Sequence, residues 1–448
     1  MMLLGTQRID EKGHLEIGGI DAVDLAREYG TPLYVMDEEL VRQNCRRFVE
    51  SYKRLYTEAE SEIAFAGKAF LSSAMCALAA SENMSLDVVS AGEIYTAQKA
   101  GYPMSRVLFH GNNKSVEELE MAMDQKIGRI VVDNLPEIDL LDALSKSRGE
   151  TVDVMLRLTP GIDPHTHKLI RTGQADTKFG LNIKDGSAMK GIKRVLECPG
   201  INLRGIHCHV GSQLLDTEAH EQAIVIMVAF MKEILDETGI EIQELNLGGG
   251  LGIRYVESHR PPSIEEFAEK IITTVRAELK RHGLKPPRLL QEPGRSIVGE
   301  AGTTLYTIGT IKEVLTTEEP GRRTYVAVDG GMSDNPRPAL YEAIYTPLMA
   351  NKANEAATWL VTIAGKHCET DTLIKDALIP DAKPGDLLAV LSTGAYNYSM
   401  ASNYNRFPTP AAVLVSGGKS EVIVKRDTLD DLVANDVIPD SLRAKQKV

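Results

Sequence analysis

Short apolar runs alternate with longer, more polar stretches between about residues 61 and 295. The runs are rich in Val, Ile and Leu, as is typical of parallel strands that are covered on both faces. Eight of them are predicted as strands: residues 62–66, 86–89, 106–109, 129–132, 152–158, 205–210, 244–247 and 288–291.

The stretches between these runs have the signals of helices. Residues 115–126 begin Ser-Val-Glu-Glu, which offers an N-cap serine and acidic side chains in the first turn. Residues 216–239 begin with Asp and end at Gly, and apolar side chains recur along one face. Eight strands with intervening helices predict an α/β fold, a (β/α)8 TIM-type barrel. A doubly wound sheet is the alternative, although six or seven strands would be more usual for it.

The pattern changes after residue 300. Strands separated by Gly, Pro and Asp turns are predicted at residues 306–312, 324–328, 359–364, 387–391, 411–415 and 421–425. They indicate a mostly antiparallel C-terminal β domain. A hydrophobic stretch at residues 14–17 and a helix at 22–29 are expected to pack on that domain. The predicted division is an N-terminal segment (1–35), a barrel (36–300) and a β domain (301–448).

Composition narrows the class of protein. Of 448 residues, 43% are hydrophobic and 25% are charged, as in ordinary globular proteins. The net charge of −13 argues against nucleic-acid binding, which needs a basic surface. Five widely spaced cysteines without a CxxC pair argue against a disulfide framework or a zinc site and favour the reducing cytoplasm. The longest apolar run, residues 223–231, is too short to span a membrane.

Polar and glycine residues follow the predicted barrel strands, at the rim where barrel enzymes place their active sites. The segments concerned are residues 67–69, 90–93, 110–113, 157–161, 209–213, 248–252 and 292–295. Three consecutive glycines, Gly248 to Gly250, can bring backbone N–H groups against a phosphate, although a tight strand–helix turn explains them equally well. The Gly211-Ser212 turn and Arg295 at neighbouring strand ends favour the phosphate.

Three further side chains at this rim suggest a cofactor. Lys68 follows a strand, and partial desolvation would lower its pKa and let it form a Schiff base, although a lysine lying along the rim is the simpler interpretation. Glu292 could pair with Arg295 or keep a pyridinium nitrogen protonated. His209 could stack on a flat ring. Together with a phosphate loop, these residues meet the requirements of pyridoxal 5′-phosphate.

The chain resembles the diaminopimelate decarboxylase family, within the barrel-type pyridoxal-phosphate group that includes ornithine and arginine decarboxylases and alanine racemase. The resemblance covers about residues 30–430. It rests on Phe-Ala-Gly-Lys-Ala (65–69), Asp-Val-Val-Ser (87–90), Phe-His-Gly-Asn-Asn-Lys-Ser (109–115), Lys-Phe-Gly (178–180), His-Cys-His-Val-Gly-Ser-Gln (207–213), Gly-Gly-Gly-Leu-Gly (248–252), Glu-Pro-Gly-Arg (292–295), Asp-Gly-Gly-Met-Ser-Asp-Asn-Pro-Arg-Pro (329–338), Cys-Glu (368–369) and Gly-Ala-Tyr (394–396).

This resemblance implies decarboxylation of meso-2,6-diaminopimelate to L-lysine and a role for each site residue. Lys68 would hold the cofactor, His209 would stack on its ring and Glu292 would pair with the ring nitrogen. The implied phosphate contacts are Ser212, Gly248, Gly249, Gly250, Gly294 and Arg295. The implied substrate contacts are Arg295, Arg337 and Tyr341 for the distal carboxylate and Glu369 for the distal ammonium, with Tyr396 beside cofactor and substrate.

The resemblance also implies that Cys368 donates the proton that replaces the lost carboxylate. In this family Cys368 and Glu369 reach into the partner's site, so a homodimer with shared active sites is implied. One departure stands in this region. Where the family reads Cys-Glu-Ser-Gly-Asp, this chain reads Cys-Glu-Thr-Asp (368–371), which could shift Cys368 and Glu369.

Three rival functions differ in their requirements. A decarboxylase of ornithine, arginine or carboxynorspermidine would share the fold, but two arginines and a tyrosine suit a substrate with a distal carboxylate. A racemase would need a tyrosine base opposite Lys68. A non-catalytic regulator would not need Lys68, Glu292 and Cys368 together.

Overall fold

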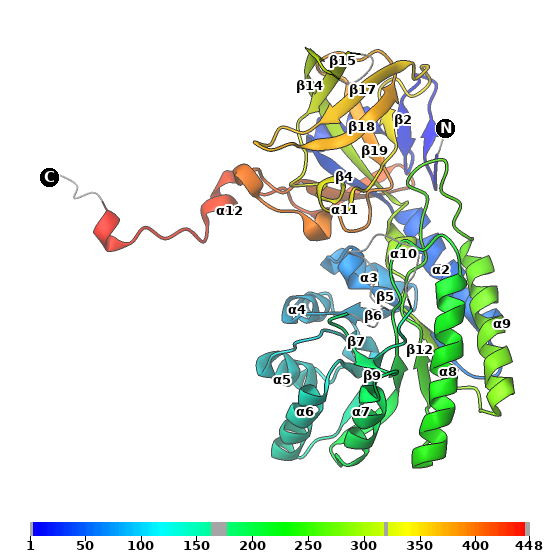
Figure 1. Cartoon of the computed structure of the whole chain (residues 1–448). Coiled ribbons are helices and arrows are strands. Elements are labelled where there is room, and N and C mark those ends of the chain that lie inside the picture. The colour runs from blue at the N-terminus through cyan, green and yellow to red at the C-terminus, as the bar shows by residue number, and fades with distance from the viewer. Residues whose placement is uncertain (1–2, 163–176, 318–320, 444–448) are drawn as a thin grey trace.

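The computed structural model describes residues 3–162, 177–317 and 321–443. Two bodies are visible, a barrel with its helices and a β domain above it (Figure 1). Residues 1–2 of the predicted N-terminal segment and residues 444–448 of the predicted β domain lie outside the described residues. Among the described helices, none has an apolar stretch that would reach across a bilayer.

The eight barrel strands that the apolar runs predict are all present, and the barrel prediction is confirmed. Each strand is parallel to its neighbours, and β8 pairs with β9 to complete a ring. In ring order the strands are β5 (Ser61–Ala66), β6 (Ser85–Val88), β7 (Val107–Phe109), β8 (Arg129–Val132), β9 (Val152–Thr159), β11 (Ile201–His207), β12 (Glu244–Asn246) and β13 (Arg288–Gln291). A short extra strand, β10 (Leu181–Asn182), pairs with β9 outside this ring.

Helices follow the strands and surround the ring (Figure 1). They are α3 (Ser73–Ser81), α4 (Ala91–Lys99), α5 (Val116–Asp124), α6 (Leu135–Arg148), α7 (Ser187–Leu196), α8 (Glu218–Thr238), α9 (Ile264–His282) and α10 (Arg295–Val298), with α2 (Glu38–Leu55) before β5 and the 3-10 turns η1 (Gly67–Ala69) and η2 (Met104–Arg106). The predicted cap is present, because the Ser115 hydroxyl accepts from the Glu118 N–H and the Glu118 carboxylate reciprocates. α2 packs beside α9, where Arg47 pairs with Glu265 at 2.6 Å.

The alternating side chains of the barrel strands form two separate apolar layers. One side chain from each of five strands fills the interior of the ring, and the opposite faces pack against the helices. The interior set is Ala64, Leu108, Val131, Met155 and Leu290. Because the barrel is filled with side chains, a ligand can reach only its rim.

The β domain contains the six predicted strands and three that the sequence pattern did not show. The predicted ones are β14 (Gly302–Leu315), β15 (Arg322–Val328), β17 (Trp359–Ala364), β19 (Leu387–Leu391), β20 (Ala411–Ser416) and β21 (Lys419–Val424). The others are β4 (Leu33–Asp37), β16 (Pro347–Met349) and β18 (Thr372–Ile379). Most pairs are antiparallel, and only β15–β17 and β20–β4 are parallel. The short helices and turns here are α11 (Arg337–Tyr341), η4 (Tyr398–Met400) and η5 (Tyr404–Arg406).

The N-terminal segment lies against the β domain. It consists of β1 (Arg8–Ile9), β2 (Leu15–Ile17), β3 (Ile20–Asp21) and α1 (Ala22–Tyr29). Leu15 and Leu25 share one buried apolar cluster with Leu305 and Val413 of the β domain. The next element, β4, lies between β14 and β20 in the large sheet, so the predicted boundary between residues 35 and 36 falls inside a strand.

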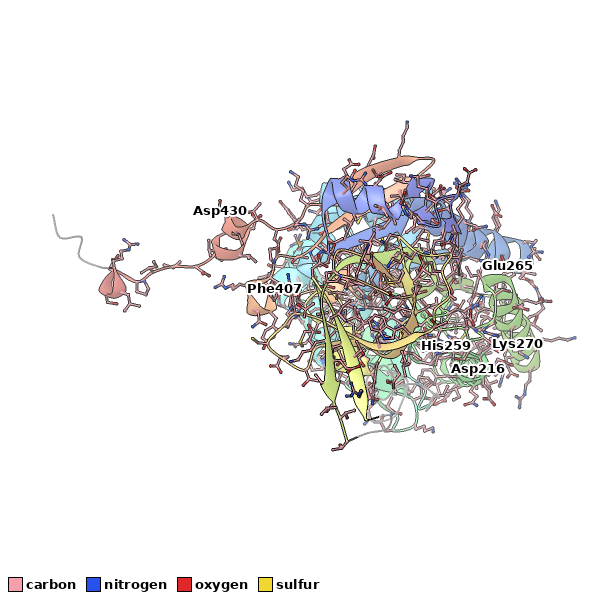
Figure 2. The ribbon with its side chains drawn as sticks, turned by 90° about the horizontal axis from the view of Figure 1, so that it is seen from above. Asp216, His259, Glu265, Lys270, Phe407 and Asp430 are labelled. Atoms are coloured by element: carbon pink, nitrogen blue, oxygen red, sulfur yellow. The ribbon has the colours of Figure 1, made fainter. Side chains whose placement is uncertain are left out.

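The C-terminal segment extends away from both bodies, as Figures 1 and 2 show from two directions. It includes α12 (Leu429–Val433) and η6 (Asp440–Leu442). An ion pair of 2.9 Å between Arg406 and Asp436 joins it to η5. Figure 2 shows Asp430 on this segment, far from Glu265 and Lys270 on the opposite side of the molecule.

Candidate active site

Lys68 lies in η1, directly after β5, and faces the carboxylate of Asp87 at the end of β6. The Lys68 Nζ to Asp87 Oδ2 distance is 2.9 Å. Burial is the largest single influence on the Lys68 ammonium and lowers its pKa, but Asp87, Tyr396 and Glu292 together outweigh burial, and the net effect raises this pKa above its usual value. The expectation of a lowered pKa for Lys68 is therefore wrong for the ligand-free chain.

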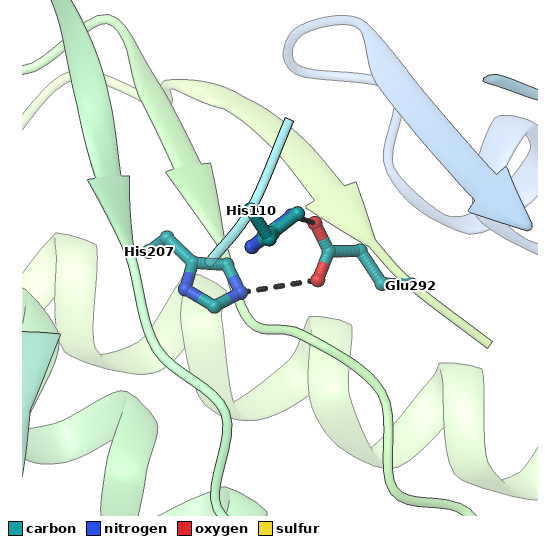
Figure 3. Close-up of side chains that lie close together, drawn as sticks. All are labelled: His110, His207 and Glu292. Carbon is teal, nitrogen blue, oxygen red and sulfur yellow. Dashed lines mark hydrogen bonds and ion pairs between the residues drawn. The ribbon is translucent and has the colours of Figure 1, made fainter. Parts of the chain in front are cut away.

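Glu292, directly after β13, is 4% exposed and accepts three hydrogen bonds. Its Oε1 accepts from His110 Nε2 at 2.9 Å and from Asn246 Nδ2 at 2.7 Å, and its Oε2 accepts from His207 Nε2 at 3.0 Å (Figure 3). Burial would raise the pKa of Glu292, but the two histidines and their hydrogen bonds lower it well below its usual range. Glu292 is therefore a carboxylate, and its partners are these side chains rather than Arg295.

His209 lies two residues beyond the end of β11, beside the three consecutive glycines. Its Nδ1 accepts the Gly249 N–H at 3.2 Å, so the ring proton is on Nε2. Burial, followed by the charge of Lys68, lowers the pKa of His209 well below its usual value. This side chain is therefore a neutral ring at the rim.

The glycine turn after β12 packs closely against neighbouring strand ends. A Cβ on Gly248 would lie 2.5 Å from the Cys208 carbonyl oxygen, and one on Gly249 would overlap the Glu292 carbonyl oxygen. Gly250 has a φ of +129°, a conformation that L side chains rarely adopt. Only glycine fits this turn, which leaves backbone rather than side chains facing the rim.

Arg295 joins the turns that follow β11 and β13. Its Nε and Nη2 lie 3.2 and 2.9 Å from Ser212 Oγ, and its Nη1 donates to the Tyr255 hydroxyl. The side chain is buried, with 3% of Arg295 exposed. A buried guanidinium beside a serine hydroxyl and glycine backbone is a site suited to an anion.

Arg295 and Arg337 both lie close to the ring of Tyr396. The guanidinium carbons lie 4.7 and 5.4 Å from its centroid, and Arg337 lies 5.2 Å from the ring of Tyr341. Arg337 is 4% exposed, and its Nε is buried without a hydrogen-bond partner among the described residues. The structure therefore brings the predicted carboxylate-binding residues together, with a buried donor still available.

Tyr396 also connects this arginine pair to Lys68. Its backbone N–H donates to the carbonyl of Ala69, the residue after Lys68, at 2.8 Å. The backbone φ of Tyr396 is 66°, which is uncommon for a residue other than glycine. The strand end of the barrel and the β domain thus meet at one site.

Cys368 and Glu369 lie elsewhere, on the surface of the β domain. Both are exposed; the Cys368 N–H donates to Asn405 at 2.9 Å, and Glu369 accepts from the Tyr404 hydroxyl at 3.0 Å. Within the described part of the chain, neither residue makes a hydrogen bond or ion pair with a barrel residue. Within one chain, their hydrogen-bond partners are therefore residues of the β domain.

Several residues of the site received no role from the sequence. His110 and His207 belong to recognised motifs, and their positions at the ends of β7 and β11 were the available signal. Asp87 is the second-last residue of β6, and Asn246 ends β12. Tyr255 had no such signal, because its position follows from the path of the loop after β12.

The chain matches the family model described as pyridoxal-dependent decarboxylase, pyridoxal binding domain, over residues 39–299. It is 51% identical to a diaminopimelate decarboxylase of Bacillus subtilis (strain 168), and the match covers 98% of each chain. The solved structure of diaminopimelate decarboxylase from M. jannaschii in complex with L-lysine is 39% identical, with a TM-score of 0.89 over 98% of this chain and 99% of that one. The Helicobacter pylori diaminopimelate decarboxylase complexed with L-lysine is 31% identical, with a TM-score of 0.82 over 92% of this chain and 98% of that one.

Proposed function

The chain belongs to the diaminopimelate decarboxylase family of pyridoxal-dependent decarboxylases, and we propose that it converts meso-2,6-diaminopimelate to L-lysine and carbon dioxide. The observation that supports this substrate is the pair of buried guanidiniums, Arg295 and Arg337, that both lie close to the ring of Tyr396. A substrate with an amino acid group at both ends needs planar capture of its distal carboxylate, which arginine provides. Ornithine and arginine have no such carboxylate.

The rim fits pyridoxal 5′-phosphate on three counts. Lys68 offers an amine, Glu292 offers a buried carboxylate, and the close-packed turn from Gly248 to Gly250 offers backbone to a phosphate. When bound, the cofactor supplies a protonated ring that accepts the electron pair left by the departing carboxylate. In this proposal Lys68 holds the cofactor and His209 stacks on its ring, while Glu292 keeps the ring nitrogen protonated. Ser212, Gly294 and Arg295 complete the phosphate site.

Asp87 and the β domain prepare this rim for the substrate. Asp87 orients Lys68 through their ion pair, and Tyr396 is fixed to the Lys68 turn by its backbone hydrogen bond to Ala69. Arg337 and Tyr341 then bind the distal carboxylate on the β-domain side. The buried unpaired Nε of Arg337 supports that role, because a carboxylate would satisfy it.

We further propose that the reaction proton comes from Cys368 of a second subunit. The exposed position of Cys368 and Glu369 on the β domain, where they are accessible to a second chain, supports this arrangement. Glu369 would meet the distal ammonium of a substrate in the partner's site. The active protein would then be a homodimer, which acts in the cytoplasm in this proposal. The division into segments 1–35, 36–300 and 301–448 likewise remains a prediction.

Substrate choice is tested by measuring carbon dioxide release from four amino acids supplied separately: meso-diaminopimelate, ornithine, arginine and carboxynorspermidine. We expect release from diaminopimelate only. Comparable release from ornithine or arginine would show that the two guanidiniums do not select a distal carboxylate. Arg337→Lys is a matched control, since it keeps the charge but not the planar fork.

A further inference from the structure

The three hydrogen bonds to Glu292 come from three different strand ends. His110 follows β7, His207 ends β11 and Asn246 ends β12, so the ring of strands brings these side chains to the Glu292 carboxylate. Figure 3 shows both imidazole rings pointing at the carboxylate from different sides. The ring centroids of His110 and His207 lie 4.8 Å apart and the ring planes make an angle of 66°, so the two rings reach the carboxylate in different orientations.

Each histidine donates through Nε2. A carboxylate only accepts hydrogen bonds, so the proton of each ring must lie on the nitrogen that faces it. His207 Nδ1 is buried and has no hydrogen-bond partner in the described part of the chain, so a second proton there would be an unsatisfied buried donor. Burial also lowers the pKa of His207 to about 4. His207 is therefore neutral at physiological pH and still donates.

The three donors do not use every position at which the Glu292 carboxylate can accept a hydrogen bond. A carboxylate has about four acceptor positions, two on each oxygen. Among the described residues, Oε1 accepts from both His110 and Asn246, whereas Oε2 accepts from His207 alone. One acceptor position remains, and it lies on Oε2.

We propose that His110, His207 and Asn246 are positioning residues that hold Glu292 ionised and leave Oε2 open to the protonated ring nitrogen of the cofactor. This inference rests on the proposed role of Glu292. Without the donors, burial would favour the protonated carboxyl. A carboxyl group that has a proton would donate to the ring nitrogen instead of accepting from it, and the ring would lose its charge.

Other charged groups surround this cluster and affect its titration. Asp87 Oδ1 lies 3.7 Å from His110 Nε2, and Lys68 pairs with Asp87. Arg157 is also buried, and burial lowers the pKa of its guanidinium, although the charges of Asp133 and Glu292 oppose this lowering. His209 lies on the same side of the site and is neutral. The test must therefore detect the proton on Glu292 itself.

The first measurement uses the cofactor-free protein. Infrared difference spectroscopy detects the carbonyl stretch of a protonated carboxyl group, and Glu292→Gln identifies which band belongs to Glu292. The matched variants are His207→Gln, which keeps an N–H near the position of Nε2, and His207→Asn, whose shorter amide cannot reach Oε2. The same pair is made at His110.

We expect no Glu292 band at pH 7 in the wild type or the glutamine variants. The double variant His110→Asn with His207→Asn should show the band at this pH. A double variant that stays folded by circular dichroism and shows no band above pH 5 would overturn the inference. If the double variant does not fold, the single asparagine variants are compared with the glutamine variants, and equal spectra overturn it as well.

The second measurement is the affinity for pyridoxal 5′-phosphate, followed by its absorbance. Loss of a hydrogen bond to a charged group predicts binding weaker by about tenfold to a hundredfold in His207→Asn, with most of it recovered in His207→Gln. If Glu292→Gln and the histidine variants all bind the cofactor as tightly as the wild type, both the proposed role of Glu292 and the proposed cofactor site are contradicted. If Glu292→Gln binds the cofactor more weakly but His207→Asn binds it as tightly as the wild type, only the present inference is contradicted.

Discussion

The Lys68 ammonium lies 2.9 Å from the Asp87 carboxylate, and the charge of Asp87 raises the pKa of that ammonium. A protonated amine is not a nucleophile, so cofactor attachment requires Lys68 to lose this proton first. Asp87 thus orients Lys68 and also keeps it protonated until a ligand enters.

Asp87→Asn should move the pH dependence of cofactor attachment to lower pH. The variant removes the charge that raises the pKa of Lys68, so burial dominates and the neutral amine appears at lower pH. The measurement is the rate at which pyridoxal 5′-phosphate attaches to the cofactor-free protein as a function of pH. Asp142→Asn is a control, because Asp142 pairs with Lys146 on the outer helix α6. An unchanged profile in Asp87→Asn would contradict the electrostatic argument.

Lys68→Ala should abolish covalent attachment of the cofactor. Lys68 lies at the rim beside the glycine turn and Glu292, whereas Lys114 is paired with Glu137 and only 1% of its side chain is exposed. Borohydride reduction of the wild type followed by mass spectrometry should place the cofactor on the peptide that contains Lys68. A label on another lysine would show that the site lies elsewhere.

Arg337→Ala should lower kcat/KM for diaminopimelate. A charge-assisted hydrogen bond contributes about 1.5–3 kcal/mol, which corresponds to a loss of roughly tenfold to a hundredfold. Arg337 is a cleaner test than Arg295, because Arg295 also contacts Ser212 in the predicted phosphate site. Cofactor affinity, measured in parallel, should be unchanged. Wild-type kinetics in Arg337→Ala would reopen the choice of substrate.

Lys114 lies in the motif of residues 109–115, and its contacts give it a structural role. Its Nζ donates to Glu137 at 2.7 Å and to the carbonyls of Val131 and Gly111. Glu137→Leu should destabilise the protein by about 3–5 kcal/mol, because it leaves a buried unpaired ammonium. The double variant Lys114→Met with Glu137→Leu should regain most of that loss. Urea unfolding measures both, and equal stability of the single and double variants would contradict the pairing argument.

The barrel was predictable because several of its strands are continuous apolar runs and all eight alternate with helical stretches. β4 was not, since Leu33–Asp37 is followed at once by α2 and its role depends on β14 and β20, which are distant in sequence. β18 was also missed, because charged residues and a register shift interrupt its alternation. The local sequence pattern identifies single helices and strands, whereas the pairing of strands that are distant in sequence depends on tertiary packing.

The candidate site shows the same division. Lys68, His209 and Glu292 lie at strand ends, so the barrel rule brings them together from sequence alone. The partners of Glu292 depend on which side chains point inward at those ends, and the pKa of Lys68 depends on a neighbour 19 residues away in sequence. For Cys368 and Glu369, sequence order gives no position relative to Lys68, because the β domain presents them on a different surface.

Cys368→Ala should bind cofactor and substrate but turn over slowly. A general acid contributes about 10²–10⁴-fold to the rate, which sets the expected loss in kcat. The exposure of Cys368 on the β domain predicts that its proton is delivered to another chain. The activity of Cys368→Ala alone does not show which chain supplies the proton, so a mixture of two variants is needed.

Two inactive variants, Lys68→Ala and Cys368→Ala, should complement each other in mixed dimers. If each site takes Lys68 from one chain and Cys368 from the other, a mixed dimer of Lys68→Ala and Cys368→Ala contains one intact site. Equal mixing with free subunit exchange then restores about one quarter of wild-type activity, because half of the dimers are mixed and each has one active site of two. Lys68→Ala mixed with Glu292→Gln is the matched control and should stay inactive, since both residues come from the same barrel. Exchange demonstrated by differently tagged subunits, without recovery of activity in the first mixture, would mean that Cys368 does not act across the dimer.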